Sequence, residues 1–302
     1  MRYSALVAIA ALGIFTADAH AARVVAFGDS WASMGAGYLA EVFVNHGHPE
    51  MTVANRGVGG STAAGWAAKP SALPDAVTAN PDAEFVWLSI GGNDVYDHFF
   101  EGDPTFLKTD NERNIRAILD ALFAVHPDIT VVSFGYDLPN LVHPACLEDA
   151  ARQLGLPPPT APLPQGLADL VTLAANYGSF DQFDDVYAGI AAEVSQVDYA
   201  PLWGALQAAG GLEGAPRLGL PSPSELMVDC IHPTGEGFRA IMDAFYARYW
   251  GPLLDGADAP PPPVPSCAVV PEGGGSPLAF APVVALLVGL GGRRASRRFR
   301  KH

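Results

Sequence analysis

Short apolar runs alternate along the chain with longer segments whose apolar residues recur at helical spacing. The apolar runs end in glycine or polar residues and cover 23–27, 51–54, 85–90, 129–134 and, more briefly, 197–199. Helical spacing is found over 35–44, 111–125, 167–177, 183–194 and 235–250. Continuous apolar strands separated by helices are typical of a parallel sheet that is covered on both faces. The pattern therefore predicts an α/β fold in three layers, with a central parallel sheet.

The ends of the predicted strands indicate where a site would lie. In sheets of this kind ligands bind beyond the carboxyl ends of the strands. We therefore expect the loops that begin at Gly28, Asn55, Gly91 and Gly135 to meet at one site. The segment 138–166 is long and rich in proline and leaves the sheet at the same edge. It is either a lid or wall of that site or a plain surface loop.

The first 21 residues have the composition of a secretory signal. Arg2 precedes an apolar stretch from Ala5 to Phe15, and the small residues Ala19 and Ala21 fit a cleavage site. This stretch is too short to span a membrane as a helix. We therefore expect an exported protein whose signal is not part of the fold. A buried N-terminal helix is the alternative.

The C-terminal part also differs from the rest of the chain. A linker rich in proline and glycine covers 255–277, and an apolar segment with a basic end covers 278–302. This layout resembles the C-terminal sorting signals of Gram-negative surface proteins, which enter the membrane transiently and are trimmed by a protease. A retained membrane anchor is the alternative. The main domain is then expected over 22–254, in the periplasm, outside the cell or on its surface.

Composition adds one strong constraint, which is charge. Hydrophobic residues make up 49% of the chain and charged residues 16%, as expected for a globular protein with a large core. Between residues 22 and 277 there are 10 basic and 31 acidic side chains, a formal charge of −21. An acidic body repels phosphate backbones, which excludes nucleic acid as a partner. The spacing of His and Cys suggests no metal site. We expect a monomer without a cofactor.

The three cysteines fit an oxidising compartment. Cys146 and Cys230 lie in the main domain, and Cys267 lies in the linker. Since disulfides persist outside the cytoplasm, we expect a bridge between Cys146 and Cys230, with Cys267 left over. Three free thiols are the alternative. A bridge would tie the segment 138–166 to the residues around Cys230.

Two motifs at strand ends could supply a nucleophile and its base. Gly28-Asp29-Ser30 places a hydroxyl after the first strand, although a serine here could also be a helix N-cap. Asp229 and His232 are three residues apart, which on a helical turn puts both side chains on one side. The carboxylate can then orient the imidazole toward a serine hydroxyl.

Two further motifs could hold a developing negative charge. Gly57 lies in a glycine-rich turn, where a backbone N–H can approach a substrate closely. Asn93 follows Gly91-Gly92, and its side-chain amide is a neutral donor suited to an oxyanion. We expect the neighbouring Asp94 to brace the loop, with a role as a catalytic acid as the alternative. Each motif, taken alone, could also be an ordinary turn.

Taken together, the four motifs resemble the SGNH (GDSL-type) hydrolase superfamily from Val24 to about Trp250. The resemblance implies a flavodoxin-like three-layer fold and a serine esterase or lipase that needs no metal or cofactor. It also implies a catalytic triad, on the matching positions Ser30, Asp229 and His232. The implied oxyanion hole falls on Ser30, Gly57 and Asn93. One departure is Trp31, where the motif that names the family has Leu.

The resemblance leaves the substrate open. A lipid or short-chain acyl ester is the first interpretation, and an O-acetyl group on a polysaccharide is the second. A non-catalytic surface binding protein on a hydrolase fold is the alternative from another class. If the chain is an esterase, we expect its activity to fall at acid pH as His232 becomes protonated. We also expect reduction of a Cys146–Cys230 bridge to lower activity.

Overall fold

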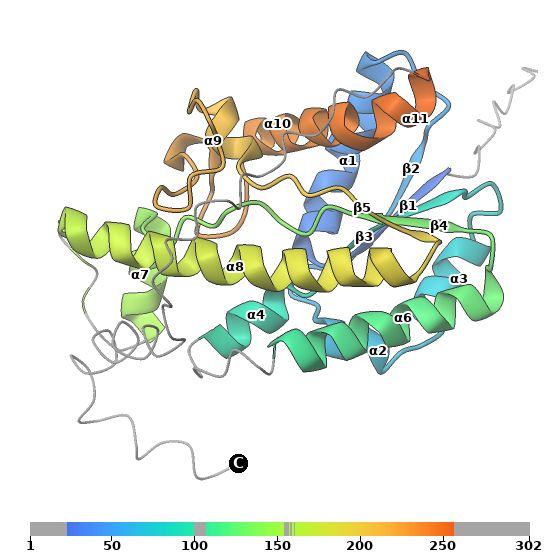
Figure 1. The fold of residues 1–302 in the computed structure, drawn as a ribbon, viewed down its shortest axis with the longest axis horizontal. Helices are drawn as coiled ribbons and strands as arrows, with labels where there is room; N and C mark the ends of the chain where they lie inside the picture. Colours follow the sequence, from blue (N-terminus) through green and yellow to red (C-terminus); the bar gives the residue numbers. More distant parts are fainter. Residues whose placement is uncertain (1–22, 100–106, 154–156, 158, 160, 257–302) are drawn as a thin grey trace, which may run out of the picture.

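The computed structural model describes residues 23–99, 107–153, 157, 159 and 161–256 (Figure 1). The predicted signal, linker and C-terminal segment lie almost wholly outside these residues, so their assignment stays a prediction. Within the described part of the chain, no helix has both the length and the apolar character needed to cross a membrane.

Five parallel strands form one sheet at the centre of the molecule. Their spatial order is β2-β1-β3-β4-β5, and their bounds are Val24–Gly28 for β1, Val53–Gly57 for β2, Phe85–Ser89 for β3, Thr130–Ser133 for β4 and Val197–Tyr199 for β5. Strand β1 pairs on both edges and all its residues are buried, which explains its unbroken apolar run. The predicted α/β fold with a central parallel sheet is confirmed.

Helices cover both faces of this sheet (Figure 1). On one face lie α1 (Ser30–Asn45), α10 (Gly235–Phe245) and α11 (Gly251–Asp255). On the other lie α2 (Ala63–Ala67), α3 (Ala72–Thr78), α6 (Glu112–Val125) and α8 (Gln165–Glu193). Further helical elements occupy the connections: α4 (Gly92–Phe99), η1 (Leu107–Asn111), α7 (Pro144–Gln153), α9 (Ala205–Ala209), η2 (Ser224–Leu226) and η3 (Tyr246–Trp250).

An aromatic cluster fixes the C-terminal helices on the sheet. The ring of Phe245 lies 5.0 Å from that of Phe134 and 5.7 Å from that of Trp250, and Trp87 stacks on Phe134 at 5.5 Å. All four side chains are fully buried. Large aromatic rings dominate the burial energy of a core. Because α10 is held in this way, the segment that precedes it is fixed at its C-terminal end.

Two helices that the sequence pattern separates are one helix in the structure. The expected segments 167–177 and 183–194 both belong to α8, which is 29 residues long. No proline interrupts this stretch, and the one glycine between the two expected segments, Gly178, costs the helix only about 1 kcal/mol. The second half of α8 buries Phe183, Val186 and Tyr187 against the sheet, and this burial offsets the cost of the glycine.

Other boundaries differ because capping and burial, rather than apolar runs, decide them. The first helix begins at Ser30 instead of residue 35, and α10 gives way to a π-helical turn after Phe245. The second strand is later than 51–54 and includes Asn55 to Gly57, which the sequence pattern assigned to a loop. The residues after Gly91 begin α4, and the segment 138–166 contains α7 rather than only loop.

Candidate functional site

Ser30 lies where the central strand turns into a helix. Strand β1 ends at Gly28, which has φ 141°, and a Cβ there would lie 1.7 Å from the carbonyl oxygen of Ser89. Only glycine fits this position. Asp29 is the N-cap of α1, because its carboxylate accepts from the N–H of Trp31 at 2.9 Å. Ser30 is therefore the first residue of the helix and not its cap, and its hydroxyl stays at the rim.

Asp229 and His232 lie in a short segment that we call the histidine turn, residues 227–233. The expected helical turn is wrong here: these residues form bends, closed by an antiparallel bridge between Met227 and Pro233. The Asp229 carboxylate shapes the turn itself, since its Oδ1 accepts from the N–H of Ile231 at 2.9 Å and of His232 at 2.8 Å. An aspartate that bonds to the backbone ahead of it replaces the helix that the spacing suggested.

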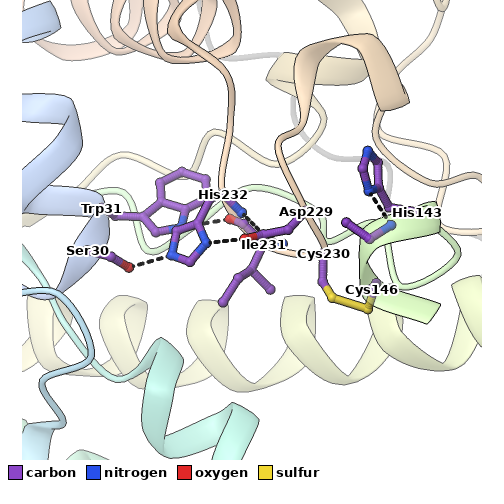
Figure 2. Close-up of polar contacts among 9 residues, drawn as sticks. Ser30, Trp31, His143, Cys146, Asp229, Cys230, Ile231 and His232 are labelled. Atoms are coloured by element: carbon purple, nitrogen blue, oxygen red, sulfur yellow. Dashed lines mark hydrogen bonds and ion pairs between the residues drawn. A yellow bond between two sulfur atoms is a disulfide. The ribbon is translucent and has the colours of Figure 1, made fainter. Parts of the chain in front are cut away.

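The structure brings Ser30, His232 and Asp229 into one line (Figure 2). His232 Nε2 lies 2.8 Å from Ser30 Oγ, and His232 Nδ1 lies 2.8 Å from Asp229 Oδ2. Burial raises the pKa of the Asp229 carboxyl, but the hydrogen bonds from the His232 ring and from the backbone outweigh burial and lower that pKa to about 2. The carboxylate is thus charged at neutral pH. A hydroxyl, imidazole and carboxylate in this order can activate the hydroxyl as a nucleophile.

The expected oxyanion donors lie on the neighbouring loops. A Cβ at Gly57 would lie 2.2 Å from the backbone nitrogen of Ser33, so glycine is needed there for packing alone. The N–H of Gly57 donates to Asn55 Oδ1 at 3.1 Å. Asn93 Nδ2 donates to the carbonyl of Ser61 at 2.8 Å, which leaves its second hydrogen for a ligand. As the first residue of α1, Ser30 has an N–H without a partner in its own helix.

The sequence matches the GDSL-like lipase/acylhydrolase family over residues 26–240. The chain belongs to this family. The resemblance that the motifs suggested is confirmed, and the chain is an ester hydrolase. No curated protein sequence matches this GDSL hydrolase.

Solved structures with a similar fold include several esterases. A GDSL-like lipase from Bacteroides thetaiotaomicron has 16% identity, with 74% of this chain and 85% of that chain covered and a TM-score of 0.44. An acetyl xylan esterase variant from Geobacillus stearothermophilus has 19% identity, with 74% of this chain and 93% of that chain covered and a TM-score of 0.45. An alpha/beta hydrolase from the metagenome of Lake Arreo has 18% identity, with 75% of this chain and 94% of that chain covered and a TM-score of 0.47. None of these likenesses bears on the substrate of this GDSL hydrolase.

A tyrosine that the sequence analysis did not single out lies beneath the site. The Tyr136 hydroxyl donates a short hydrogen bond to Asp29 Oδ2 and accepts from the N–H of Gly92 at 2.9 Å. It thereby joins the loop that carries Ser30 to the loop that carries Asn93. Burial raises the pKa of Asp29 to about 7, although the bonds from Tyr136 and Trp31 act in the opposite direction. The sequence contains one signal for Tyr136: it follows Gly135, the glycine that comes directly after the fourth apolar run.

Asp94 braces two of the loops in this GDSL hydrolase, as its position after Asn93 predicts. Its carboxylate accepts from the N–H of Ala63 at 2.7 Å and of Ala64 at 3.3 Å, and the side chain is buried. These bonds hold the glycine-rich segment after Gly57 against the start of α4. A role as a catalytic acid does not fit a carboxylate that is engaged in this way.

A disulfide joins Cys146 to Cys230, with the two Cα atoms 5.1 Å apart (Figure 2). It connects α7 with the histidine turn, and the N–H of Asn140 adds a bond to the carbonyl of Cys230 at 2.7 Å. The segment 138–166 is thus attached next to His232 at its described residues. Cys267 lies outside the described residues. Among the described residues, no group of three or more His, Cys, Asp or Glu side chains is placed to hold a metal ion.

Proposed function

We propose that this GDSL hydrolase is an exported serine esterase with Ser30 as its nucleophile. The observation that carries the proposal is the line from Ser30 Oγ through His232 to Asp229, with both contacts at 2.8 Å. His232 takes the proton of Ser30 as Oγ attacks the ester carbonyl. His232 then passes that proton to the departing alcohol, which leaves an acyl-enzyme. Water, deprotonated by His232, releases the acid and restores Ser30.

In this reaction the oxyanion is stabilised by donors at the start of two helices. The N–H of Ser30 and the free Nδ2 hydrogen of Asn93 are available without rearrangement. The N–H of Gly57 is already bonded to Asn55 Oδ1, so it contributes only as that bond is shared or released. Asp229 stays ionised through the cycle and stabilises the imidazolium that forms on His232.

We further propose a carboxylic ester with an apolar part as the substrate. Three exposed hydrophobic side chains come from positions next to the site: Met34, Val58 and Val228 are 42%, 50% and 54% exposed. Val58 follows Gly57 directly and Val228 precedes Asp229 directly. Met34 is one helical turn after Ser30, and side chains on a helix lean toward its N-terminus, which here is the site. Exposed apolar groups around a reacting centre favour an apolar acyl or alcohol group over a free sugar surface.

Export is supported by the signal-like segment at the N-terminus and by the disulfide, since such bonds persist outside the cytoplasm. We propose that the C-terminal segment serves sorting, with trimming by a membrane protease. The mass of the mature protein isolated from its host tests both ideas. Removal of about 21 N-terminal residues and of the basic C-terminal cluster is expected, and retention of either end contradicts the corresponding proposal.

The test of the reaction is hydrolysis of p-nitrophenyl esters from acetyl to palmitoyl by the full chain, beside an acetylated oligosaccharide. We expect Ser30→Ala to lower kcat by at least about 10³-fold while the protein stays folded. A preference for esters longer than acetyl supports the apolar site. Activity confined to the acetylated oligosaccharide would favour a carbohydrate esterase, and a Ser30→Ala protein as active as the wild type would refute the serine mechanism.

A further inference from the structure

Trp31 makes a direct connection between the two halves of the site. Its indole Nε1–H donates to the carbonyl oxygen of Ile231 at 2.9 Å (Figure 2). Trp31 follows Ser30 in the chain, and Ile231 precedes His232. One hydrogen bond therefore joins the neighbour of the proposed nucleophile to the neighbour of its proposed base, across 200 residues of sequence.

The indole is a rigid donor because its surroundings hold the ring. Trp31 is only 3% exposed. Its ring meets Tyr136 edge-on at 5.2 Å and Phe238 at 5.7 Å, and it lies 6.1 Å from the ring of Phe134. The backbone N–H of Trp31 is bonded to Asp29 as well. A donor fixed at backbone and ring cannot follow the turn, so the Ile231 carbonyl is held where the indole points.

The histidine turn has a second attachment on its other side. There the disulfide joins Cys230 to Cys146, and the Asn140 N–H bonds to the Cys230 carbonyl. These contacts come from α7 and the chain before it, whereas the Trp31 bond comes from α1, the helix that begins at Ser30. The turn is thus held from two directions, and on the side of α1 the Trp31 bond lies beside the contact between Ser30 Oγ and His232 Nε2.

We propose that Trp31 is a positioning residue for the reaction, in that its indole N–H keeps His232 Nε2 within hydrogen-bond reach of Ser30 Oγ. This inference rests on the proposed function. Leucine, which the name-giving motif of the family has at this position, has no donor and could not make this bond. Trp31 therefore adds a restraint between base and nucleophile. Since small misplacements of a base slow proton transfer, the restraint acts on kcat and leaves substrate binding unchanged.

The test removes the donor and keeps an apolar side chain. In the full chain, Trp31→Phe is expected to lower kcat for p-nitrophenyl acetate about tenfold, with KM within about twofold of the wild type. The rate at which a fluorophosphonate labels Ser30 should fall equally. Trp203→Phe is the matched control: it removes another buried indole, whose Nε1 donates to the Tyr199 hydroxyl at 3.3 Å and not to a residue of the histidine turn. Its labelling rate should stay at the wild-type value.

A combination with the disulfide tests whether the two attachments share the task. In a Cys146→Ala, Cys230→Ala background, Trp31→Phe should lower kcat by more than the product of the separate losses, to at least about 100-fold in total. Trp31→Leu is the second variant, and it keeps the test valid if the phenylalanine protein is unstable. A side chain that serves only packing would lower the melting temperature and leave kcat and labelling unchanged.

The outcomes separate this inference from the proposed function. Unchanged kcat and labelling in a folded Trp31→Phe or Trp31→Leu protein, with and without the disulfide, would overturn the positioning role alone. If instead Ser30→Ala is labelled as fast as the wild type, the serine mechanism fails, and the inference fails with it. Loss of kcat with unchanged KM in both Trp31 variants, together with the greater-than-multiplicative loss without the disulfide, supports the inference.

Discussion

Ser30 and His232 are held by two different kinds of structure. Ser30 begins a helix at the end of a fully buried central strand, so the packing of the whole core determines its position. His232 lies in a turn without helix or strand, which a few separate contacts determine: the Asp229 carboxylate, a disulfide and one indole. The comparison teaches that damage near Ser30 should cost stability together with activity. Damage to the histidine turn should cost activity far more than stability.

The largest expected effect comes from the histidine turn. In Asp229→Asn the amide oxygen can still accept from the backbone, so the turn should keep its shape. The amide cannot stabilise the imidazolium of His232, however, and it favours the wrong tautomer. We expect kcat to fall about 10⁴-fold, while the unfolding free energy at neutral pH falls by no more than about 2 kcal/mol, because only the small stabilisation from the lowered Asp229 pKa is lost.

Steady-state kinetics and urea unfolding of the same preparation check this prediction. Asp243→Asn is the control, because Asp243 is an exposed carboxylate whose partner is also a histidine, His46, at 3.7 Å. That variant should change neither quantity. A loss in kcat below tenfold for Asp229→Asn would show that the carboxylate does not orient the base.

The dependence of stability on pH should separate the two regions next. Burial raises the pKa of Asp29 to about 7 from its ordinary value of 3.8. Between these values the folded state holds a proton that the unfolded state has lost, so stability falls as pH rises from about 4 to 7, by up to about 4 kcal/mol. Hydrogen bonds lower the pKa of Asp229 to about 2, so its contribution to stability is lost as pH falls below about 4.

Urea unfolding from pH 2 to 8 tests this pair of opposite slopes, with a maximum expected near pH 4. Asp29→Asn should make the slope above the maximum shallower, with the remaining slope due to Asp137, whose pKa burial raises to about 6. Asp229→Asn should make the slope below the maximum shallower. The groups facing Asp29 are Tyr136, His232 and Asp94. Tyr136→Phe removes a donor from the carboxylate, which raises the Asp29 pKa further, so the fall in stability should continue to higher pH than in the wild type. Stability that rises from pH 4 to 7 in the wild type would contradict a raised pKa at Asp29.

The smallest of these effects concerns Gly57, at the edge of the sheet. A Cβ there would meet the backbone of Ser33, in the first turn of α1, so Gly57→Ala must displace the helix that carries Ser30. We expect a loss of about 1–3 kcal/mol in stability and a lower kcat at the same time. Gly59→Ala is the control, since nothing lies within 4 Å of its added Cβ. A Gly57→Ala protein with full stability would show that the edge of the sheet moves to accommodate the added methyl group. The position of Ser30 would then depend less on core packing than the comparison with the histidine turn assumes.

The sequence also predicts these two regions unequally: it predicts the sheet that holds Ser30 better than the turn that holds His232. The sheet was predictable because β1, β3 and β4 are buried, which leaves an apolar run in the sequence. The exposed edge strand β2 has no such run, and its bounds were wrong. Side chains, not periodicity, build the histidine turn. The spacing of Asp229 and His232 therefore suggested the right pair but the wrong local shape, a helical turn, and the family resemblance added support for the pair.

The contacts that refine the site were also hidden from the sequence. Tyr136 is an aromatic residue after a strand, and nothing in its neighbourhood shows that its hydroxyl would meet Asp29. The bond from Trp31 to Ile231 depends on residues that only the fold brings together. A sequence pattern reports local burial, whereas these contacts depend on the relative placement of distant segments.

The distance along the chain between Ser30 and His232, 202 residues, has a consequence for biosynthesis. A ribosome completes the hydroxyl-bearing segment long before it reaches the imidazole. A partly made chain therefore holds a serine without its base, and a product truncated before α10 lacks the anchor that sets the histidine in place. Hydrolytic power should thus arise abruptly, with the docking of the last helices, and a nascent chain should carry no esterase activity that could act on the lipids or metabolites around it.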